Sequence, residues 1–333
     1  LSLGLALSAW TWSAGHLTEK RSMCVGALAG FSLGLSAMTR PEGVMIFGLV
    51  GLYRLWVLVR ARSWLTSSDW GGILGFVLLY IPYYIWRYGY YGYPFPNTYY
   101  AKVGALGFWE PGLRYVGEWL LFHMWLMTPV VLWLVRLFSS KKSEEHEPWE
   151  GERHLGRVTI LCGLALCIHV AKVGGDFMAL HRFLVPLLPL SAALCSRSLA
   201  SLYRSLVSTV SLDQRWIKFS AIMILAASAV LIHRDANRIG SRGGVDSIGW
   251  LRQFSEQCAQ TGRYINQHPP EASKLATTAA GALPFYAKRY TVDLLGLNDE
   301  WIAHHVPARG QRPGHTKAAP FRYPIDQGVD YLV

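Results

Sequence analysis

Short polar motifs interrupt this otherwise apolar chain, and the first of them could bind a phosphate group. In Thr39-Arg40-Pro41-Glu42-Gly43, the Arg40 guanidinium can hold a phosphate while Glu42 orients Arg40 or contacts a sugar hydroxyl. Pro41 ends a helix and Gly43 permits a tight turn into the next one, so these residues could also form a plain hairpin with its charges among lipid headgroups. The spacing alone leaves both interpretations open.

The second motif, PNTYYAK at 96–102, carries side chains suited to a sugar phosphate. The Asn97 amide can exchange hydrogen bonds with sugar hydroxyls, and the rings of Tyr99 and Tyr100 can pack against the C–H surface of a sugar. Lys102 could act as a point charge for a phosphate. The alternative is an aromatic loop that contacts lipid headgroups, which accounts for the tyrosines better than for Asn97 and Lys102.

The third motif, GGDFM at 174–178, places an acidic residue close to two basic ones. If the chain from 177 to 184 is helical, Asp176 and His181 lie about one turn apart, with Arg182 offset. Asp176 could then pair with Arg182, or it could accept a hydroxyl proton or hold a ligand. Ionisable residues grouped at the mouth of a membrane helix bundle favour a functional role.

Apolar segments separate these motifs and predict an integral membrane protein. The 333 residues are 52% hydrophobic and 16% charged, which is far from the composition of a soluble enzyme. The apolar residues form blocks of roughly 17–25 residues, the length that crosses a hydrocarbon core. The predicted fold class is membrane all-α, a polytopic transmembrane helix bundle with about eight visible spans, at 1–14, 22–38, 44–60, 71–86, 116–138, 155–171, 183–203 and 217–232.

Basic residues distinguish the two sides of this bundle. Lys and Arg gather in the loops after the first, third, fifth and seventh spans, whereas the motifs follow the second, fourth and sixth. Because cytoplasmic loops are enriched in Lys and Arg, the motifs are predicted to share the extracytoplasmic face. The net charge of +11 comes mostly from these short loops rather than from a basic stripe or tail, which argues against nucleic acid as a partner.

The chain after the last span is predicted to form a second domain. Apolar positions at helical spacing predict an amphipathic helix over 248–267. Segments 274–278 and 289–295 have the composition of short strands, and a tight turn leads from the first of them into a short helix. We therefore expect a transmembrane domain over 1–233 and a small extracytoplasmic α/β domain over 234–333.

Cofactors and metals have no visible signature in this sequence. Four of the five cysteines lie in apolar segments, where Cys behaves as a small hydrophobic residue, and no pairing pattern is visible. No set of His, Cys, Asp and Glu has a recognisable metal-ligand spacing, so we expect no cofactor and no metal, with a divalent ion left open. Asp293 and Asp299 fit structural caps as well as they fit ligands.

Together, these motifs resemble those of the C-type (GT-C) membrane glycosyltransferases. The similarity is greatest to bacterial proteins related to the mycobacterial terminal β-(1→2) arabinofuranosyltransferase, and it covers about residues 22–303. The features that carry it are TRPEG at 39–43, PNTYYAK at 96–102, GGDFM at 174–178 followed by Arg182-Phe183, and DLLGLND at 293–299.

The resemblance implies a multi-span enzyme of the bacterial inner membrane, with its motif loops and C-terminal domain outside. The donor would be a polyprenyl-phosphate-linked sugar, such as a pentose in the arabinofuranose form, and the acceptor a cell-envelope glycan or another molecule. Arg40, Lys102 and Arg182 would bind the donor phosphate and stabilise the leaving group. The residues assigned to sugar or acceptor binding are Glu42, Asn97, Tyr99, Tyr100, Asp176 and His181.

The resemblance also implies where the catalytic base lies. In this superfamily the catalytic acidic residue typically follows the first span, so by analogy it is expected upstream of Leu1. The stretch from Leu1 to Val333 begins in an apolar run and stops in a strand-like one, and it would then be a truncated fragment that is inactive alone. Within it, Asp176 and Glu42 are the acidic residues that could take the place of the base.

Two other classes of protein fit parts of the pattern. A transporter or flippase for a lipid-linked glycan should carry charged or broken segments near mid-bilayer, whereas the charges here lie at the ends of the spans. A non-catalytic membrane scaffold could use its outer domain to bind a cell-wall component. Activity measurements on variants of Arg40, Lys102 and Asp176 would separate the scaffold from the enzyme.

Overall fold

The computed structural model describes most of the chain as two compact units. The described residues are 1–12, 17–102, 108–129, 131–132, 150–209, 214–238, 240–242, 244–268, 270–310, 312 and 315–333. Unit 1 comprises Leu1–Gly92, His123–Ile168 and Leu184–Ser228, and unit 2 comprises Tyr93–Phe122, His169–Phe183 and Ala229–Val333. The predicted domain boundary at 233/234 stays a prediction, because unit 2 draws on both sides of it.

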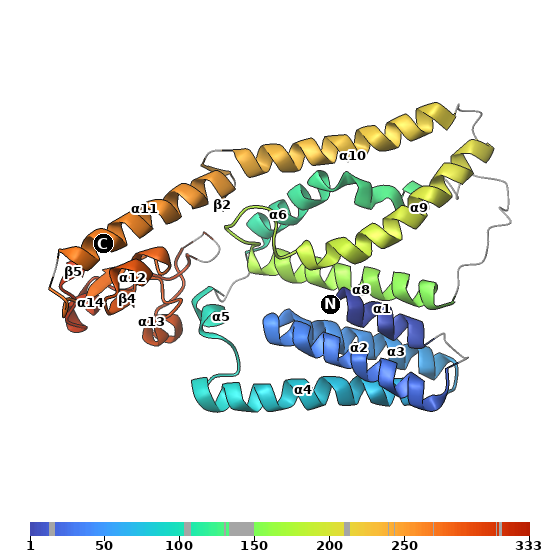
Figure 1. The fold of residues 1–333 in the computed structure, drawn as a ribbon, viewed down its shortest axis with the longest axis horizontal. Coiled ribbons are helices and arrows are strands. Elements are labelled where there is room, and N and C mark those ends of the chain that lie inside the picture. Colours follow the sequence, from blue (N-terminus) through green and yellow to red (C-terminus); the bar gives the residue numbers. More distant parts are fainter. Residues whose placement is uncertain are drawn as a thin grey trace. The chain divides into compact units, whose positions relative to one another are not determined.

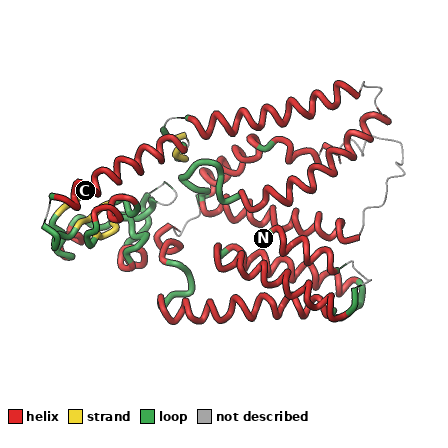
Figure 2. The backbone as a smooth tube through the Cα atoms, viewed as in Figure 1, coloured by secondary structure: helices red, strands yellow, loops and turns green. Residues whose placement is uncertain are grey.

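Unit 1 contains helices and, in its described residues, no strand (Figures 1 and 2). Its elements are α1 (Ser2–Thr11), α2 (Glu19–Thr39), α3 (Glu42–Arg60), α4 (Ser67–Tyr91), the 3-10 helices η1 (Met124–Met127) and η2 (Val185–Leu187), and α9 (Leu188–Thr209). The long helices α8 (Glu150–Val173) and α10 (Gln214–Asn237) contribute residues to both units.

Unit 2 mixes short helices with short strands (Figure 2). Its helices are α5 (Asn97–Lys102), α6 (Trp109–Phe122), α11 (Ile248–Gln267), α12 (Ala282–Ala287), α13 (Glu300–His305) and α14 (Arg322–Asp326). Its strands are β1 (Ser241–Arg242), β2 (Val245–Asp246), β3 (Leu275–Thr277), β4 (Thr291–Asp293) and β5 (Tyr331–Leu332).

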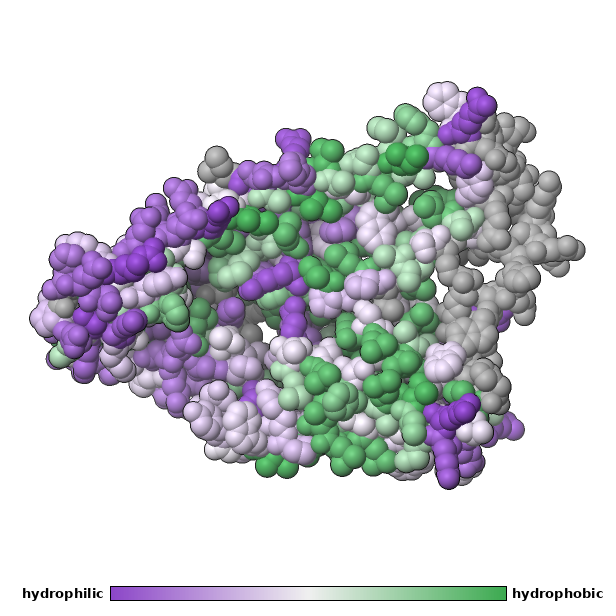
Figure 3. All heavy atoms as spheres, viewed as in Figure 1, coloured by the Kyte–Doolittle hydropathy of each residue, from purple (hydrophilic) through white to green (hydrophobic). Residues whose placement is uncertain are grey.

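Helices long and apolar enough to cross a membrane number four over the described residues. They are Glu19–Thr39 (α2), Glu42–Arg60 (α3), Arg153–Val173 within α8 and Lys218–Asn237 within α10. These correspond to the predicted spans at 22–38, 44–60, 155–171 and 217–232. In Figure 3 the visible surface of the unit 1 helices is largely hydrophobic, as expected of segments that face lipid.

The other four predicted spans are not among these helices, for reasons of length or composition. α1 has 10 residues, and α4 has 25, but Tyr and Trp lower the hydropathy of its second half. The predicted span 116–138 begins in α6, which ends at Phe122, and its residues 133–138 lie outside the described part of the chain. The predicted span 183–203 begins in a turn and continues into η2 and the Ser-rich helix α9.

Glycines allow α2 and α4 to approach each other closely. A Cβ on Gly30 would lie 1.9 Å from the carbonyl oxygen of Gly72, and a Cβ on Gly75 would lie 2.1 Å from that of Ala27. Helices in a bilayer associate through packing rather than through exclusion of water, so small residues are favoured where their backbones touch. The two helices are therefore held by backbone contact, and a side chain at Gly30 has no space.

Replacing Gly30 by alanine is expected to destabilise unit 1 by roughly 1–3 kcal/mol, because the added methyl group must push α2 and α4 apart. Thermal unfolding of the detergent-solubilised protein, followed by static light scattering, measures the effect. Gly48→Ala is the matched control, since a Cβ on Gly48 meets no atom within 4 Å. Equal melting temperatures for the two variants would show that the close approach is unnecessary.

The C-terminal part of unit 2 has the predicted α/β character. β3 lies between β4 and β5 and runs parallel to both, and α12 connects β3 to β4 as a compact βαβ unit. The predicted amphipathic helix over 248–267 is confirmed as α11, whose first turn is capped by the Ser247 hydroxyl accepting from the Trp250 amide. Cys258 and Ile265 of α11 pack into a core with Leu275.

Candidate functional site

The third motif forms an irregular loop in unit 2. Gly174 and Gly175 both have positive φ, and a Cβ on Gly175 would lie 2.6 Å from Cγ of the Tyr115 ring, so glycine is required there. The helix considered for 177–184 is not present: the chain turns, and Leu180 and His181 take left-handed φ values of 63° and 48°. The loop geometry therefore follows from its two glycines and from the contact of Gly175 with Tyr115 of α6.

Asp176 pairs with Arg182 across this loop, as one of the two sequence hypotheses proposed. The Asp176 side chain is almost fully buried, whereas that of Arg182 remains 45% exposed. Arg182 donates from Nε and Nη2 to the two carboxylate oxygens of Asp176. The two parallel hydrogen bonds fix the plane of the guanidinium and leave its outer edge open to solvent.

Lys102, at the end of α5, lies beside this pair. Its Nζ is 5.9 Å from the centre of the Phe177 ring, and it makes no hydrogen bond or ion pair with another described residue. Burial lowers the pKa of the Lys102 ammonium, the charge of Asp176 raises it, and the charge of Arg182 lowers it. The net shift is downward, so Lys102 is a half-buried cation whose charge Asp176 helps to maintain.

Arg312 adds a third cation that the sequence analysis missed. Its Cζ lies 5.6 Å from the centre of the Phe177 ring, and its Nη2 donates to the buried carboxylate of Asp246. The Asp246 amide in turn donates to the Phe177 carbonyl at 2.7 Å, which attaches β2 to the motif. The only sequence signal was a second arginine three residues after Arg309, and nothing in it pointed to Phe177.

His181 lies in the interior, not at a surface that could receive a sugar. It is 2% exposed, its ring packs 4.6 Å from Tyr115 and 5.3 Å from Phe122, and its Nε2 is 3.9 Å from Glu118 Oε2. The predicted contact of His181 with a sugar stays a prediction. His181 anchors the loop to α6.

Asn97 also has a structural position. Its Nδ2 donates to the carbonyl oxygens of Gly296, Leu297 and Asp299, at 3.0, 3.1 and 3.3 Å. The amide hydrogens that were expected to meet sugar hydroxyls are therefore used within unit 2. The second and fourth motifs, far apart in the sequence, are joined through Asn97.

Replacing Asn97 by aspartate is expected to destabilise unit 2 by roughly 2 kcal/mol or more, because a carboxylate would face carbonyl oxygens where a donor stood. Circular dichroism during heating of the purified protein measures the loss. Thr98→Asp is the matched control, since Thr98 is exposed on the same short helix. If Asn97→Asp melted with Thr98→Asp, the hydrogen bonds would contribute nothing.

The tyrosines of the second motif divide into one packed ring and one open ring. Tyr100 lies 4.2 Å from the His304 ring, which stacks on Tyr93 at 4.0 Å. Tyr99 is 40% exposed and lies 4.6 Å from Phe95. Tyr99 therefore keeps a ring face available for a ligand, whereas Tyr100 helps to hold α5 against α13.

Arg40 and Glu42 belong to unit 1. Arg40 follows the last residue of α2, Glu42 begins α3, and Arg40 Nη2 donates to Glu42 Oε1 at 3.0 Å, with Nε at 3.4 Å from Oε2. Glu42 therefore orients the Arg40 guanidinium, which is one of the two roles considered for Glu42. The structure thus gathers Lys102, Asp176 and Arg182 in unit 2 and a separate Arg–Glu pair in unit 1.

No cluster of three or more His, Cys, Asp or Glu side chains that could hold a metal is found in the described residues. Asp293 accepts from the amides of Leu295 and Asn298, at 3.0 and 2.9 Å. Asp299 accepts from the Ile302 amide at 2.9 Å and so caps α13. The carboxylates of Asp293 and Asp299 are therefore caps of a turn and a helix.

The fold and the site together define a mostly helical protein with four helices long and apolar enough to cross a membrane and with basic residues gathered around Phe177. The chain is similar to two terminal β-(1→2)-arabinofuranosyltransferases. It is 30% identical to that of Corynebacterium glutamicum over 198 residues, 53% of this chain and 26% of the relative. It is 30% identical to that of Mycobacterium tuberculosis over 189 residues, 51% of this chain and 28% of the relative.

These comparisons confirm the predicted resemblance to terminal β-(1→2)-arabinofuranosyltransferases. The chain matches only about a quarter of the length of each. Residues 249–333, which include α11 and the three-stranded sheet, match a domain of unknown function, DUF8728. No solved structure matches the chain.

Proposed function

We propose that this chain belongs to a membrane glycosyltransferase that moves a sugar from a polyprenyl-phosphate donor to a glycan or other acceptor on the extracytoplasmic face. The similarity to two arabinofuranosyltransferases is the observation that carries the proposal. Their names make a pentose in the arabinofuranose form the first sugar to test. The helices that could cross a membrane supply the apolar surroundings that a polyprenyl chain needs.

The charges around Phe177 support an anionic donor. Lys102, Arg182 and Arg312 are three cations, Asp176 and Asp246 are two carboxylates, and the sum is one net positive charge. Fixed positive charge stabilises a departing polyprenyl phosphate, because the charge on its oxygen develops as the glycosidic bond breaks. In this proposal Lys102 supplies that charge, and the open edges of Arg182 and Arg312 orient the phosphate.

Each of the two acidic candidates for the base is engaged by an arginine. Asp176 accepts two hydrogen bonds from Arg182, and Glu42 accepts from Arg40. A carboxylate held in this way suits the positioning of a cation better than proton transfer. We therefore assign Asp176 and Glu42 to positioning rather than to proton transfer.

A transfer assay tests the proposal directly. Membranes from cells that produce the full-length protein are supplied with radiolabelled polyprenyl-phosphate arabinofuranose and a glycan acceptor, and labelled glycan is counted. Membranes from cells lacking the protein are the control. Label in the glycan only when the protein is present supports the proposal, and no transfer from this or any other polyprenyl-phosphate sugar overturns it.

The proposed sidedness has its own test. Thr98 and Ser63 are both exposed, Thr98 in the second motif and Ser63 in a loop predicted to be cytoplasmic. In a background where the exposed Cys24 is replaced by serine, Thr98→Cys should react with a membrane-impermeant maleimide in intact spheroplasts. Ser63→Cys should react only after permeabilisation. The opposite pattern would place the motifs in the cytoplasm.

A further inference from the structure

Unit 1 contains a pocket among α1, α2, α3 and α4 that the proposed transfer site does not use. Its cavity volume is about 130 Å³. The walls are mainly apolar and include Trp12, Ala29, Leu33, Phe47, Val50 and Leu55. Because α2 and α3 are both long and apolar enough to span a membrane, we take the medium around this pocket to be hydrocarbon.

The polar end of the pocket is already neutralised. Arg54 and Asp69 are 9% and 8% exposed and form two hydrogen bonds, Nε to Oδ1 at 2.8 Å and Nη2 to Oδ2 at 3.1 Å. The guanidinium also lies 5.3 Å from the Trp12 ring. With both charges satisfied by each other, the interior of the pocket suits an uncharged chain rather than an ion.

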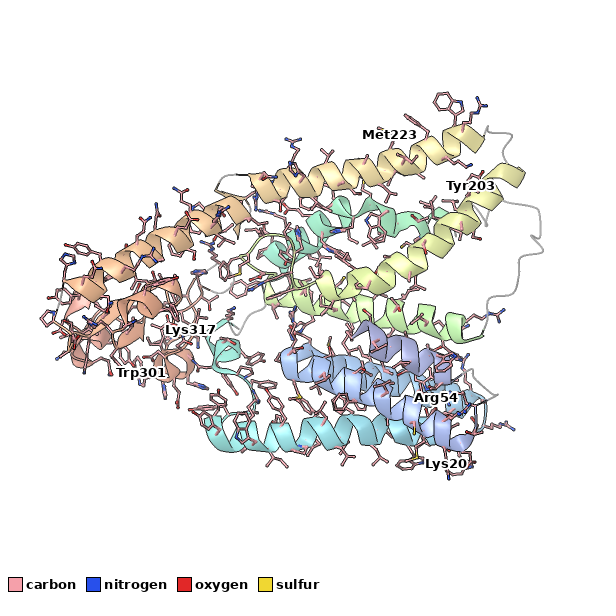
Figure 4. The ribbon with its side chains drawn as sticks, viewed as in Figure 1. Lys20, Arg54, Tyr203, Met223, Trp301 and Lys317 are labelled. Atoms are coloured by element: carbon pink, nitrogen blue, oxygen red, sulfur yellow. The ribbon has the colours of Figure 1, made fainter. Side chains whose placement is uncertain are left out.

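Exposed basic residues surround this end of the unit. Lys20 and Arg21 follow Glu19 in the first turn of α2, and Arg60 and Arg62 lie at the end of α3 and just beyond it. Figure 4 shows Lys20 and Arg54 at the same end of these helices. Arg60 is six residues beyond Arg54, about 9 Å along the helix. This is the end that the basic loops predict to be cytoplasmic.

We propose that the pocket binds one acyl chain of an anionic phospholipid from the cytoplasmic leaflet, with the lipid phosphate on these basic residues. An apolar pocket with a neutral polar end and a basic rim matches an amphiphile with a long chain and a negative headgroup. The Arg40–Glu42 pair lies at the other ends of α2 and α3. The proposal therefore stands independently of sugar transfer.

Two glycines of α3 give a matched pair of variants. Gly51 lines the pocket, Gly48 does not, and a Cβ on either would meet no atom within 4 Å. Leucine is a better helix former than glycine at both positions. Gly51→Leu should therefore fill the pocket without straining the fold, and Gly48→Leu should leave it open. Their melting temperatures check that both variants are folded.

The probe is a phosphatidylglycerol with a photoreactive diazirine on one acyl chain, compared with the matching phosphatidylcholine, in nanodiscs holding the full-length protein. We expect phosphatidylglycerol to label pocket residues, and Gly51→Leu to reduce that labelling by about tenfold, since each buried methylene adds to lipid affinity. Gly48→Leu should label like the parent. Replacing Lys20 and Arg62 by glutamine should lower labelling by phosphatidylglycerol but not by phosphatidylcholine.

Three outcomes overturn the proposal. Unchanged labelling in Gly51→Leu would mean that the chain lies elsewhere. Equal labelling by the two lipids would show that the basic residues do not recognise the lipid headgroup. Cross-links between two copies of the protein, formed with a separate bifunctional reagent and lost in Gly51→Leu, would show that a second copy fills the pocket instead.

Discussion

Replacing Lys102 by glutamine is expected to lower the rate of sugar transfer by about 100- to 1,000-fold, the loss typical when one fixed donor to a developing anion is removed. Lys102 makes no hydrogen bond or ion pair with another described residue, and burial disfavours its charge. Its removal should therefore cost little stability. The measurement is kcat/KM for the full-length protein in nanodiscs, alongside its melting temperature.

A matched control and a contrary result make this prediction sharp. Lys288→Gln removes an exposed lysine of the same unit and should leave transfer within about twofold of the parent, because exposed charges contribute little. If Lys102→Gln transferred sugar at the rate of the parent, Lys102 would not belong to the phosphate site. A large fall in both transfer and melting temperature would instead assign it a structural role.

The pH dependence of transfer should also report the charge of Lys102. The ammonium binds phosphate only while protonated, so transfer persists below the pKa of Lys102 and falls as pH rises through it. Because the charge of Asp176 raises that pKa, Asp176→Asn should move the alkaline fall in kcat/KM to lower pH. Lys102→Arg should abolish this fall, since arginine stays charged. An alkaline fall that persists in Lys102→Arg belongs to another group.

Local signals in the sequence predicted the parts of the fold that local interactions decide. The apolar spacing over 248–267 gave α11 correctly. The strands at 274–278 and 289–295 appear as β3 and β4, shorter by one or two residues at each end. The helix period acts over a few residues, so one sequence contains enough information to place this helix.

Contacts between distant segments could not be predicted in the same way. Asn97 meets carbonyls about 200 residues away, and Arg312 meets Asp246 and Phe177. Composition identified Asn97 as a polar residue in an aromatic loop, but only the tertiary fold shows that its donors are used internally. His181 was similarly assigned to sugar binding from its residue type alone, whereas its left-handed φ and its burial depend on the loop around it.

Replacing Arg182 by glutamine is expected to lower both transfer and stability, and a second change separates the two effects. The carboxylate of Asp176 is almost fully buried, whereas Arg182 is 45% exposed. Leaving Asp176 unpaired should cost about 2 kcal/mol. This is below the roughly 3–5 kcal/mol of fully buried pairs, because water reaches the Arg182 side of this pair.

In the double variant Asp176→Asn/Arg182→Gln, a neutral pair of similar size replaces the charged pair, so the melting temperature should return close to that of the parent. Transfer should remain about 100-fold low, because the guanidinium that orients the donor phosphate is still missing. Stability and kcat/KM are measured on the same nanodisc samples. If transfer recovered together with stability, Arg182 would serve only as the partner of Asp176, and the phosphate site would have to be assigned to Lys102 and Arg312 without it.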